Sequence, residues 1–331
     1  MTKTILLTHT PDMRRNYYGE RALAGLNALA TVRFHESDAP LAGTSLIEAA
    51  AGCAVIVSDR QTPGDAAIFG ALPDLVAFVR CAVDIRNVAV PAASANGVLV
   101  THASAGFIAS VAELVLGSMI DLGRHVTPAA TTYHGGVAPT ALRGIQLRGS
   151  TLGILGYGAI GRYLADLGVA LGMNVLVADP YAKVDKTGIV QTDMPDLLTH
   201  ADFVVCLVVA NEETENLMND AAFARMKPSA YFINVSRGNL VDEAALARAL
   251  DAKRIAGAAL DVGRAPDQMP SLALARRRDV IATPHIGGLT APAIEHQALE
   301  TVAQVAEILK GKAPKGAANA DRATRLTRLR S

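Results

Sequence analysis

Three glycines in one short turn, Gly156, Gly158 and Gly161, are the residues best suited to holding a phosphate group. They follow the apolar run 151–155 and open a helix-like stretch. In a strand–turn–helix unit the first glycine permits a tight turn, the second lets the backbone approach a pyrophosphate, and the third lets the helix pack on the strand. A methyltransferase loop can carry the same spacing, but we predict a dinucleotide site on the backbone of Gly156, Gly158, Ala159, Ile160 and Gly161.

Asp179 indicates which dinucleotide this turn favours. It lies 18 residues after Gly161, directly after the apolar run 175–178. A carboxylate there accepts hydrogen bonds from the ribose hydroxyls of NAD and repels the 2′-phosphate of NADP. The next residues, Pro180 and Tyr181, offer a 2′-phosphate no cation. We therefore predict NAD as the cofactor, the alternative being that Asp179 only caps a helix or a turn.

Two further side chains could carry out chemistry on an organic acid. Arg237 follows the apolar run 231–233, and a planar guanidinium can grip both the carboxylate and the carbonyl oxygen of a 2-oxo acid. His285 follows another predicted strand, and histidine readily gives and recovers a proton near neutral pH, as reduction of a ketone requires. Gly287, two residues on, allows close backbone contact with a ligand. The alternatives are a surface salt bridge for Arg237 and a structural role for His285.

The composition favours a protein that acts on a small molecule. The chain has 331 residues, enough for two domains, and is 50% hydrophobic and 19% charged, as expected for a compact α/β protein. Its 31 basic and 31 acidic residues give a formal charge of zero, so no overall field attracts nucleic acid or an anionic membrane. We predict neither as a partner.

Cysteine usage and hydropathy indicate a cytoplasmic protein. Cys53, Cys81 and Cys206 are an odd number without CxxC spacing, which argues against a disulfide framework and a zinc site, so we predict no metal. The most continuous apolar run, 203–210, is far shorter than the roughly 20 residues that cross a bilayer. The N-terminus shows no pattern for export.

These residues must be positioned by alternating strands and helices. Apolar runs predict strands at 5–8, 54–58, 75–79 and 98–100 in the first part of the chain, and at 151–155, 175–178, 203–209, 231–235, 256–261 and 280–283 in the second. The pattern predicts helices at 21–30, 109–122 and 291–309. We expect an α/β protein with two doubly wound parallel sheets.

The ordered set of motifs resembles the D-isomer-specific 2-hydroxyacid dehydrogenase family, which includes phosphoglycerate, D-lactate and glyoxylate/hydroxypyruvate enzymes. The similarity spans nearly the whole chain and rests on the glycine turn, Ala201–Val204, Met226–Pro228, Asn234–Gly238, Val241–Glu243, Gly257–Val262 and Thr283–His285. It implies a flavodoxin-like substrate domain (1–101 and 289–331) and a Rossmann NAD-binding domain (102–288), with a cleft between them. It also implies a homodimer that forms through the irregular segment 124–148.

The resemblance implies a role for each matching residue. Arg237 would bind and polarise the substrate, and His285 would be the acid/base. Asp261 would lie near the nicotinamide carboxamide, with Val235, Ser236 and Gly287 as further cofactor contacts. The loop of Cys81, Ala82 and Val83 would receive the substrate carboxylate.

Three departures from the family qualify this picture. The family's glutamate, which holds and charges the catalytic histidine, is absent from 263–267, and Asp267 could replace it or merely cap a loop. Asp84 would repel a substrate carboxylate unless Arg80 or Arg86 neutralises it, and a local structural ion pair is the preferred interpretation. Phe107 replaces an asparagine of formate-oxidising relatives, so formate is not the expected substrate.

We expect an NAD-dependent enzyme that transfers a hydride between nicotinamide and C2 of a small 2-hydroxy or 2-oxo acid. The alternative is an NAD-binding regulatory protein of the corepressor type with weak or no catalysis. The basic tail from Gly311 is expected to be solvated and mobile.

Overall fold

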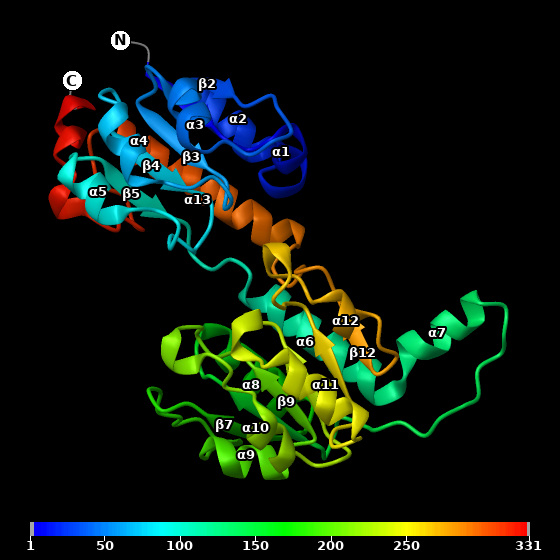
Figure 1. Cartoon of the computed structure of the whole chain (residues 1–331). Helices are drawn as coiled ribbons and strands as arrows, with labels where there is room; N and C mark the ends of the chain where they lie inside the picture. The colour runs from blue at the N-terminus through cyan, green and yellow to red at the C-terminus, as the bar shows by residue number, and fades with distance from the viewer. Residues whose placement is uncertain (1–2, 330–331) are drawn as a thin grey trace. The chain divides into compact units, whose positions relative to one another are not determined.

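Short buried runs of apolar residues form the sheets of two structural units, and the computed structural model describes residues 3–329 (Figure 1). The first unit comprises the described residues up to Phe107 and from Thr290 onward, and the second is Ile108–Leu289. Both units are α/β with parallel sheets, as predicted.

The first unit has a five-stranded sheet in the order β2-β1-β3-β4-β5. Its strands are β1 (Thr4–Leu7), β2 (Thr31–Phe34), β3 (Val55–Ser58), β4 (Ala77–Arg80) and β5 (Leu99–His102), and its helices are α1 (Pro11–Tyr17), α2 (Glu20–Leu29), α3 (Gly43–Ala50), α4 (Ala66–Ala71), α5 (Val90–Ala95) and α13 (Ala291–Leu309). All neighbouring strands are parallel, with Ile5 opposite Val55 and Val55 opposite Ala77. This is the flavodoxin-like strand order, in which the switch point lies between β1 and β3.

The end of the chain returns to the first unit and packs on it. Helix α13 lies along α2 (Figure 1), where the buried hydroxyls of Tyr18 and Thr301 are 2.8 Å apart. Beyond α13, Asn319 is buried, and its amide accepts from Val100 N–H and donates to the carbonyl of Val98. Two 3-10 turns follow, at Ala320–Arg322 and Thr324–Leu329. The expectation of a mobile tail is therefore wrong for the described residues, because this segment buries both apolar side chains and a polar anchor.

The second unit has a seven-stranded sheet in the order β12-β11-β10-β9-β6-β7-β8, with every neighbouring pair parallel. The strands are β6 (Thr151–Leu155), β7 (Asn174–Ala178), β8 (Ile189–Gln191), β9 (Phe203–Cys206), β10 (Tyr231–Asn234), β11 (Gly257–Leu260) and β12 (Val280–Ala282). The helices are α6 (Ile108–Arg124), α7 (Val126–His134), α8 (Ala159–Ala170), α9 (Met194–His200), α10 (Asp220–Arg225), α11 (Glu243–Asp251) and α12 (Leu272–Ala275). This is the Rossmann order, with a switch point between β6 and β9.

Both faces of the second sheet are covered, which explains the uninterrupted apolar runs. In β9, Val204 and Cys206 belong to one hydrophobic core, whereas Phe203 and Val205 belong to the core on the other face. Side chains on a strand alternate between faces, so a strand that is buried on both sides needs no polar residue.

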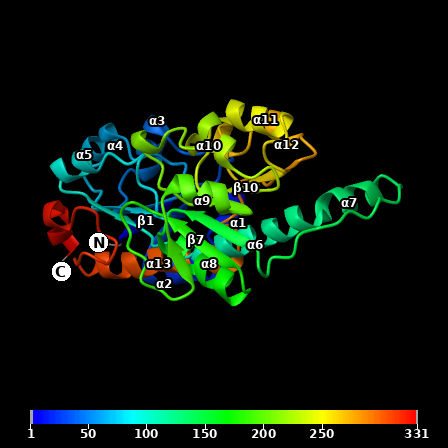
Figure 2. The ribbon, with the colours of Figure 1, turned by 90° about the horizontal axis from the view of Figure 1, so that it is seen from below.

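The segment after α6 is partly helical, which corrects the expectation of an irregular stretch at 124–148. Helix α7 occupies Val126–His134 and extends, with the chain that follows it, away from the rest of the second unit (Figure 2). Four large apolar side chains on this arm are 51–65% exposed: Val126, Tyr133, Val137 and Leu142.

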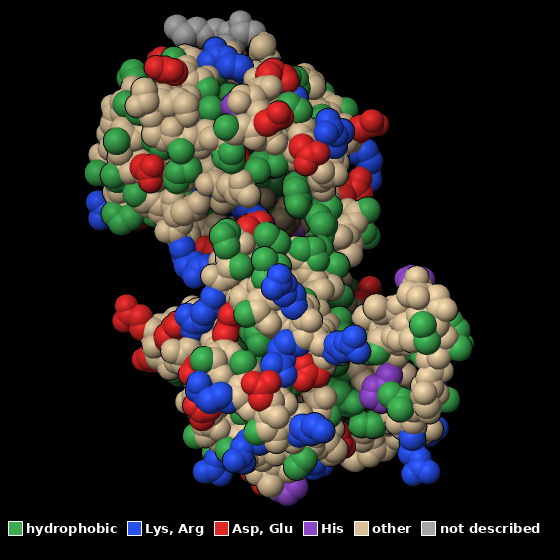
Figure 3. Space-filling model, turned by 45° about the vertical axis from the view of Figure 1, so that its right-hand side comes forward, with side chains coloured by type: hydrophobic (Ala, Val, Ile, Leu, Met, Phe, Trp, Pro, Cys, Tyr) green, Lys and Arg blue, Asp and Glu red, His purple; other side chains and the backbone are tan. Residues whose placement is uncertain are grey.

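The surface of each unit carries both signs of charge. Figure 3 shows basic and acidic side chains beside one another. Ion pairs include that of Lys186 with Asp166 at 2.5 Å. Within residues 3–329, no helix combines the length and the apolar character needed to span a membrane.

Candidate active site

The glycine turn joins β6 to α8, and a glycine is needed at its three positions for different physical reasons. At Gly156 φ is +96°, and an added Cβ would lie 2.7 Å from the carbonyl oxygen of Leu207. At Gly161 a Cβ would collide with the carbonyl oxygen of Gly156. At Gly158, the N-cap of α8, a Cβ would meet nothing within 4 Å. Two glycines are thus required by packing, whereas the third leaves open space at a helix N-terminus, as a pyrophosphate needs.

Asp179 follows β7 and is fixed as a carboxylate beside this turn. Its Oδ2 accepts from Tyr157 N–H at 2.7 Å, and its Oδ1 accepts from the N–H groups of Tyr181 and Ala182 at 2.8 and 3.0 Å. Partial burial favours the protonated acid, but these N–H donors and nearby Arg162 outweigh it and hold the pKa of Asp179 below its usual value. Asp179 therefore does cap a turn, as the alternative interpretation predicted. Oδ1 accepts two hydrogen bonds and Oδ2 only one, so Oδ2 retains a lone pair with which to accept from a ribose.

Arg237 stands in a turn that a buried asparagine builds at the end of β10. The Asn234 side chain donates to the carbonyl of Arg237 at 2.9 Å and accepts from Ser236 N–H at 3.1 Å. The Ser236 hydroxyl donates to the Val208 carbonyl at 2.7 Å, which ties the turn to the end of β9. Asn234 is not among the residues predicted for the site, although an amide at the end of a buried strand is a signal for such a turn.

Asp261, at the end of β11, organises the loop that carries His285. Its buried carboxylate accepts from the Thr283 hydroxyl at 2.6 Å and from the N–H groups of Ile286 and Gly287, both at 2.8 Å. A Cβ at Gly287 would lie 2.9 Å from Asp261 Oδ2, so this contact needs a glycine. Asp261 therefore has a structural role in this loop. Its contact with the nicotinamide carboxamide is a proposal.

His285 is half-buried and follows β12, with its backbone in the left-handed region at φ 56°. Its N–H donates to the carbonyls of Asp261 and Thr283, both at 2.9 Å. The Nδ1 of its ring lies 3.1 Å from the main-chain oxygen of Asp267. The contact between His285 and the proposed replacement for the family's glutamate is thus made by the backbone of Asp267.

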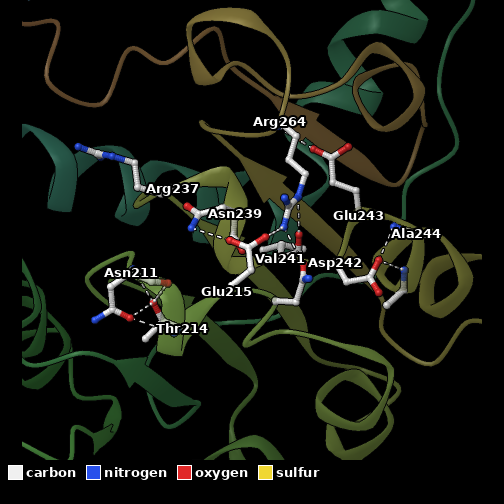
Figure 4. A network of polar contacts seen from close by, with 12 residues as sticks. Asn211, Thr214, Glu215, Arg237, Asn239, Val241, Asp242, Glu243, Ala244 and Arg264 are labelled. Carbon is white, nitrogen blue, oxygen red and sulfur yellow. Dashed lines mark hydrogen bonds and ion pairs between the residues drawn. The ribbon is translucent and has the colours of Figure 1, made fainter. Parts of the chain in front are cut away.

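Arg264 lies in the loop from which the glutamate is missing, and it joins three segments of the second unit (Figure 4). Its guanidinium donates to Glu215 at 2.8 Å, to Asn216 at 2.6 Å, and to the carbonyls of Asn239 and Val241 at 3.0 and 3.2 Å. In Figure 4 the side chain of Arg237 points away from this network. A hollow of about 300 Å³ lies here, lined by Gly238, Asn239, Gly263, Arg264, Ala265 and Gln268.

The predicted substrate loop follows β4 and so belongs to the first unit. Arg80 is buried there and donates to the carbonyls of Asp59 and Thr62 and to Asn87 Oδ1. Burial lowers the pKa of its guanidinium to about 10, although Asp59 opposes the shift. Asp84 instead pairs with Arg86 at 2.6 Å, which confirms a local ion pair. Cys81 N–H donates to the Ser58 carbonyl at 2.8 Å, and burial raises the pKa of its thiol to about 12.

The residues of the second unit share one edge of its sheet. Arg237, Asp261 and His285 follow the adjacent strands β10, β11 and β12, and the glycine turn and Asp179 follow the adjacent strands β6 and β7. Because all these strands are parallel, their carboxyl ends lie at the same edge, where open α/β sheets bind ligands. Within residues 3–329, no group of three or more His, Cys, Asp or Glu side chains is arranged to hold a metal ion.

Comparison with known families identifies this arrangement. Residues 116–287 match the model described as "D-isomer specific 2-hydroxyacid dehydrogenase, NAD binding domain". The chain belongs to this family. It is 33% identical over 300 residues to (S)-sulfolactate dehydrogenase of Chromohalobacter salexigens, which covers 88% of this chain and 96% of the relative. It is 34% identical over 244 residues to D-3-phosphoglycerate dehydrogenase of a Synechocystis species, covering 72% of this chain and 44% of the relative.

Solved structures share the fold of this chain. A crystal structure of a Thermus thermophilus protein superposes on this chain with a TM-score of 0.84 at 27% identity. The match covers 95% of this chain and 99% of the Thermus chain. The apo-structure of D-lactate dehydrogenase from Escherichia coli gives 0.83 at 23% identity, with the same coverage. The chain spans about half the length of the phosphoglycerate dehydrogenases that it matches.

Proposed function

We propose that this protein is an NAD-dependent oxidoreductase acting on a small 2-hydroxy or 2-oxo acid. The observation that carries the proposal is that Arg237, Asp261 and His285 follow three adjacent strands at the sheet edge that also holds the glycine turn and Asp179. A module that only binds NAD needs the turn and the carboxylate, but it needs no guanidinium and imidazole beside them.

The cofactor site is the glycine turn together with Asp179. Gly158 leaves the open space that a pyrophosphate requires, and the ionised Asp179 suits a ribose with free hydroxyls. Ala159, Ile160, Val235, Ser236 and Gly287 supply further contacts on this edge. When bound, NAD accepts or supplies the hydride. Rates with NADPH that equal those with NADH would contradict this choice of cofactor.

Each catalytic residue has one task in this proposal. Arg237 binds the carboxylate of the acid and polarises its C2 oxygen through a second N–H group. His285 donates a proton to that oxygen during reduction and takes a proton from the hydroxyl during oxidation. The resemblance to the family assigns a second contact with the carboxylate to the loop of Cys81, Ala82 and Val83 in the first unit, and we include this loop in the proposal. Because the Cys81 N–H already donates to the Ser58 carbonyl, the amide groups that this loop offers to the carboxylate are those of Ala82 and Val83.

The test is turnover of NADH with a panel of 2-oxo acids: glyoxylate, hydroxypyruvate, pyruvate and phenylpyruvate. Loss of the NADH absorbance band with at least one acid, abolished in His285→Gln, is the expected result. Sulfopyruvate and phosphohydroxypyruvate extend the panel to the oxidised forms of the acids for which the relatives are named. No turnover with any acid, by protein that still binds NADH, would leave a regulatory NAD-binding protein as the better interpretation.

A homodimer through the α7 arm is part of the same proposal. Val126, Tyr133, Val137 and Leu142 expose large apolar surfaces on a segment that extends from its unit (Figures 1 and 2). Such surfaces are typical of association sites. Light scattering should give the mass of two chains, and Tyr133→Asp together with Leu142→Asp should reduce it to one. A monomeric wild-type protein would contradict the proposal.

A further inference from the structure

The ring of His285 is held by a main-chain carbonyl in a loop of unusual backbone conformation. Nδ1 of His285 lies 3.1 Å from the carbonyl oxygen of Asp267. Asp267 and the next residue, Gln268, both have φ in the left-handed region, at 57° and 58°, and His285 itself is at 56°. Residues other than glycine rarely adopt this region, so three of them at one contact point to a constraint imposed by function.

The chemistry of the contact fixes where the proton of the imidazole lies. A carbonyl oxygen only accepts hydrogen bonds, so Nδ1 must carry a hydrogen. The neutral ring is then the tautomer with Nδ1–H, and its Nε2 keeps a free lone pair. In the charged ring Nδ1 donates in the same way, and only Nε2 gains a proton. The exchangeable proton is therefore always on Nε2.

We propose that the main-chain carbonyl of Asp267 is the positioning group for His285, in the place where the family's glutamate carboxylate would act. This inference rests on the proposed function, because it assigns Nε2 of His285 as the atom that exchanges the proton with the substrate. The Asp267 side chain is not required for this task. What is required is that the loop keeps its left-handed conformation.

The surrounding contacts explain how the loop keeps that conformation. Gly263 N–H donates to the Gln268 carbonyl at 2.8 Å and Ala265 N–H to the Met269 carbonyl at 3.0 Å, which closes the loop on itself. Arg264 N–H donates to Glu243 Oε1 at 3.0 Å, and the guanidinium of Arg264 ties the loop to Glu215, Asn216, Asn239 and Val241 (Figure 4). Arg264 is thus a second positioning residue, which acts on His285 through the loop.

The experiment reads the tautomer directly and needs no substrate. The full chain is labelled with ¹⁵N-histidine, and the shifts of the two ring nitrogens of His285, assigned with His285→Gln, report which nitrogen carries the proton. We expect the Nδ1–H tautomer in the wild-type protein, in Asp267→Asn and in Asp267→Gly, because asparagine and glycine tolerate positive φ. We expect a mixture of tautomers in Asp267→Val, because a β-branched residue disfavours that conformation.

A second pair of variants covers the case in which Asp267→Val does not fold. Arg264→Ala removes the ties of the loop and should give the same mixture of tautomers. Lys186→Ala, which removes an exposed ion pair with Asp166 elsewhere in the unit, should leave the tautomer unchanged. If Asp267→Asn and Asp267→Gly shift the tautomer as far as Asp267→Val does, the carboxylate holds the ring and the proposal is wrong. If neither Asp267→Val nor Arg264→Ala shifts it, the ring is held elsewhere and the proposal is also wrong.

Kinetics separate this inference from the function on which it rests. With a 2-oxo acid that is turned over, kcat of Asp267→Val should fall about tenfold below that of Asp267→Gly, with KM changed less, because a misoriented general acid impairs the chemical step. If the tautomers behave as expected and no acid is turned over, the proposed function fails while the positioning of His285 stands. If turnover occurs but the tautomer is Nε2–H, only this inference fails.

Discussion

Arg237 presents a planar group at the end of β10, and its geometry distinguishes it from a general positive charge. We predict that Arg237→Lys lowers kcat/KM for the best 2-oxo acid about 100-fold, which is about 3 kcal/mol of transition-state stabilisation. An ammonium keeps the charge but cannot donate two parallel hydrogen bonds to a carboxylate and a carbonyl. Initial rates with NADH measure the loss. The affinity for NADH, measured by fluorescence, should stay within about twofold.

Lys227→Arg is a matched control for that exchange of cations. Lys227 pairs with Asp202 at 2.9 Å, before β9 and away from the carboxyl ends of the strands, so an arginine there should leave kcat/KM unchanged. Equal kcat/KM in the wild-type protein and Arg237→Lys would mean that Arg237 acts only as a point charge.

At the scale of residues, the sequence could reveal those whose side-chain type is itself the signal. A guanidinium and an imidazole, each directly after an apolar run, are conspicuous, and the structure does place Arg237 and His285 at strand ends. The residues that hold these two side chains in place could not be predicted from residue type in the same way. The side chains of Asn234 and Asp261 bond to main-chain groups of other residues, and Asp267 meets His285 through its carbonyl oxygen. A main-chain acceptor leaves no trace in the residue type.

The turn between β6 and α8 makes an element-scale prediction, because its glycines separate folding from binding. Gly158→Ala should keep the stability of the protein but weaken NADH binding about tenfold or more, since the new Cβ meets open space where the pyrophosphate would lie. Gly161→Ala should destabilise the fold by about 3 kcal/mol, because its Cβ would collide with the Gly156 carbonyl inside the packed turn. Thermal unfolding measures the change in stability, and NADH titration measures the change in affinity. Equal effects of both substitutions on stability would contradict this division.

The end of the chain makes a second prediction about an element. Asn319 bonds Val100 N–H, the Val98 carbonyl and the Ser94 hydroxyl, so Asn319→Leu should leave buried polar groups without partners and cost about 3 kcal/mol. Asp321→Asn, an exposed change two residues on, is the control and should cost nothing measurable. Thermal unfolding compares the two variants. Equal melting temperatures would show that the tail does not stabilise the first unit.

Elements with an uninterrupted apolar run were predictable, and elements fixed by distant partners were not. β6 and α13 have the predicted bounds, because burial on both faces gives β6 an uninterrupted apolar run and burial along one stripe gives α13 a helical period. β2, at the edge of its sheet, alternates exposed and half-buried residues and carries no such run. The tail looked solvated because of its arginines. Arg325 and Arg328 instead donate to carbonyls at 72–75, which composition alone cannot foresee.

At the scale of the whole molecule, the two α/β units and their parallel sheets followed from the alternation of runs along the sequence. Parallel strands need crossover helices, and right-handed crossovers leave few topologies to choose from. The strand order was implied by the resemblance to a family and not by the runs, because a run shows that a strand is buried and not which strand lies beside it. The structure supplies that order in both sheets.

The stability of the whole chain should depend on pH through one buried histidine. His9 is buried against Tyr18, with ring centroids 5.0 Å apart. Burial lowers the pKa of His9 to about 4, with Arg80 and Arg14 lowering it further and Asp59 opposing them. Between pH 6.5 and 4 the unfolded chain therefore binds a proton at His9 that the folded chain refuses. The free energy of unfolding must fall as the pH falls through this window, by about 3 kcal/mol at pH 4, and be independent of His9 above it.

The variant His9→Gln isolates this contribution, because glutamine stays neutral throughout. Its free energy of unfolding at pH 7 can be lower than that of the wild-type protein, so the quantity to compare is the slope against pH. Urea titrations at several pH values between 4 and 7 should give a shallower slope of the free energy of unfolding against pH in His9→Gln than in the wild-type protein. The exposed His200→Gln, in the second unit, should keep the wild-type slope. Equal slopes for His9→Gln and the wild-type protein would mean that His9 is protonated inside the fold. Asp59 would then have to compensate two buried cations, the imidazolium of His9 and the guanidinium of Arg80.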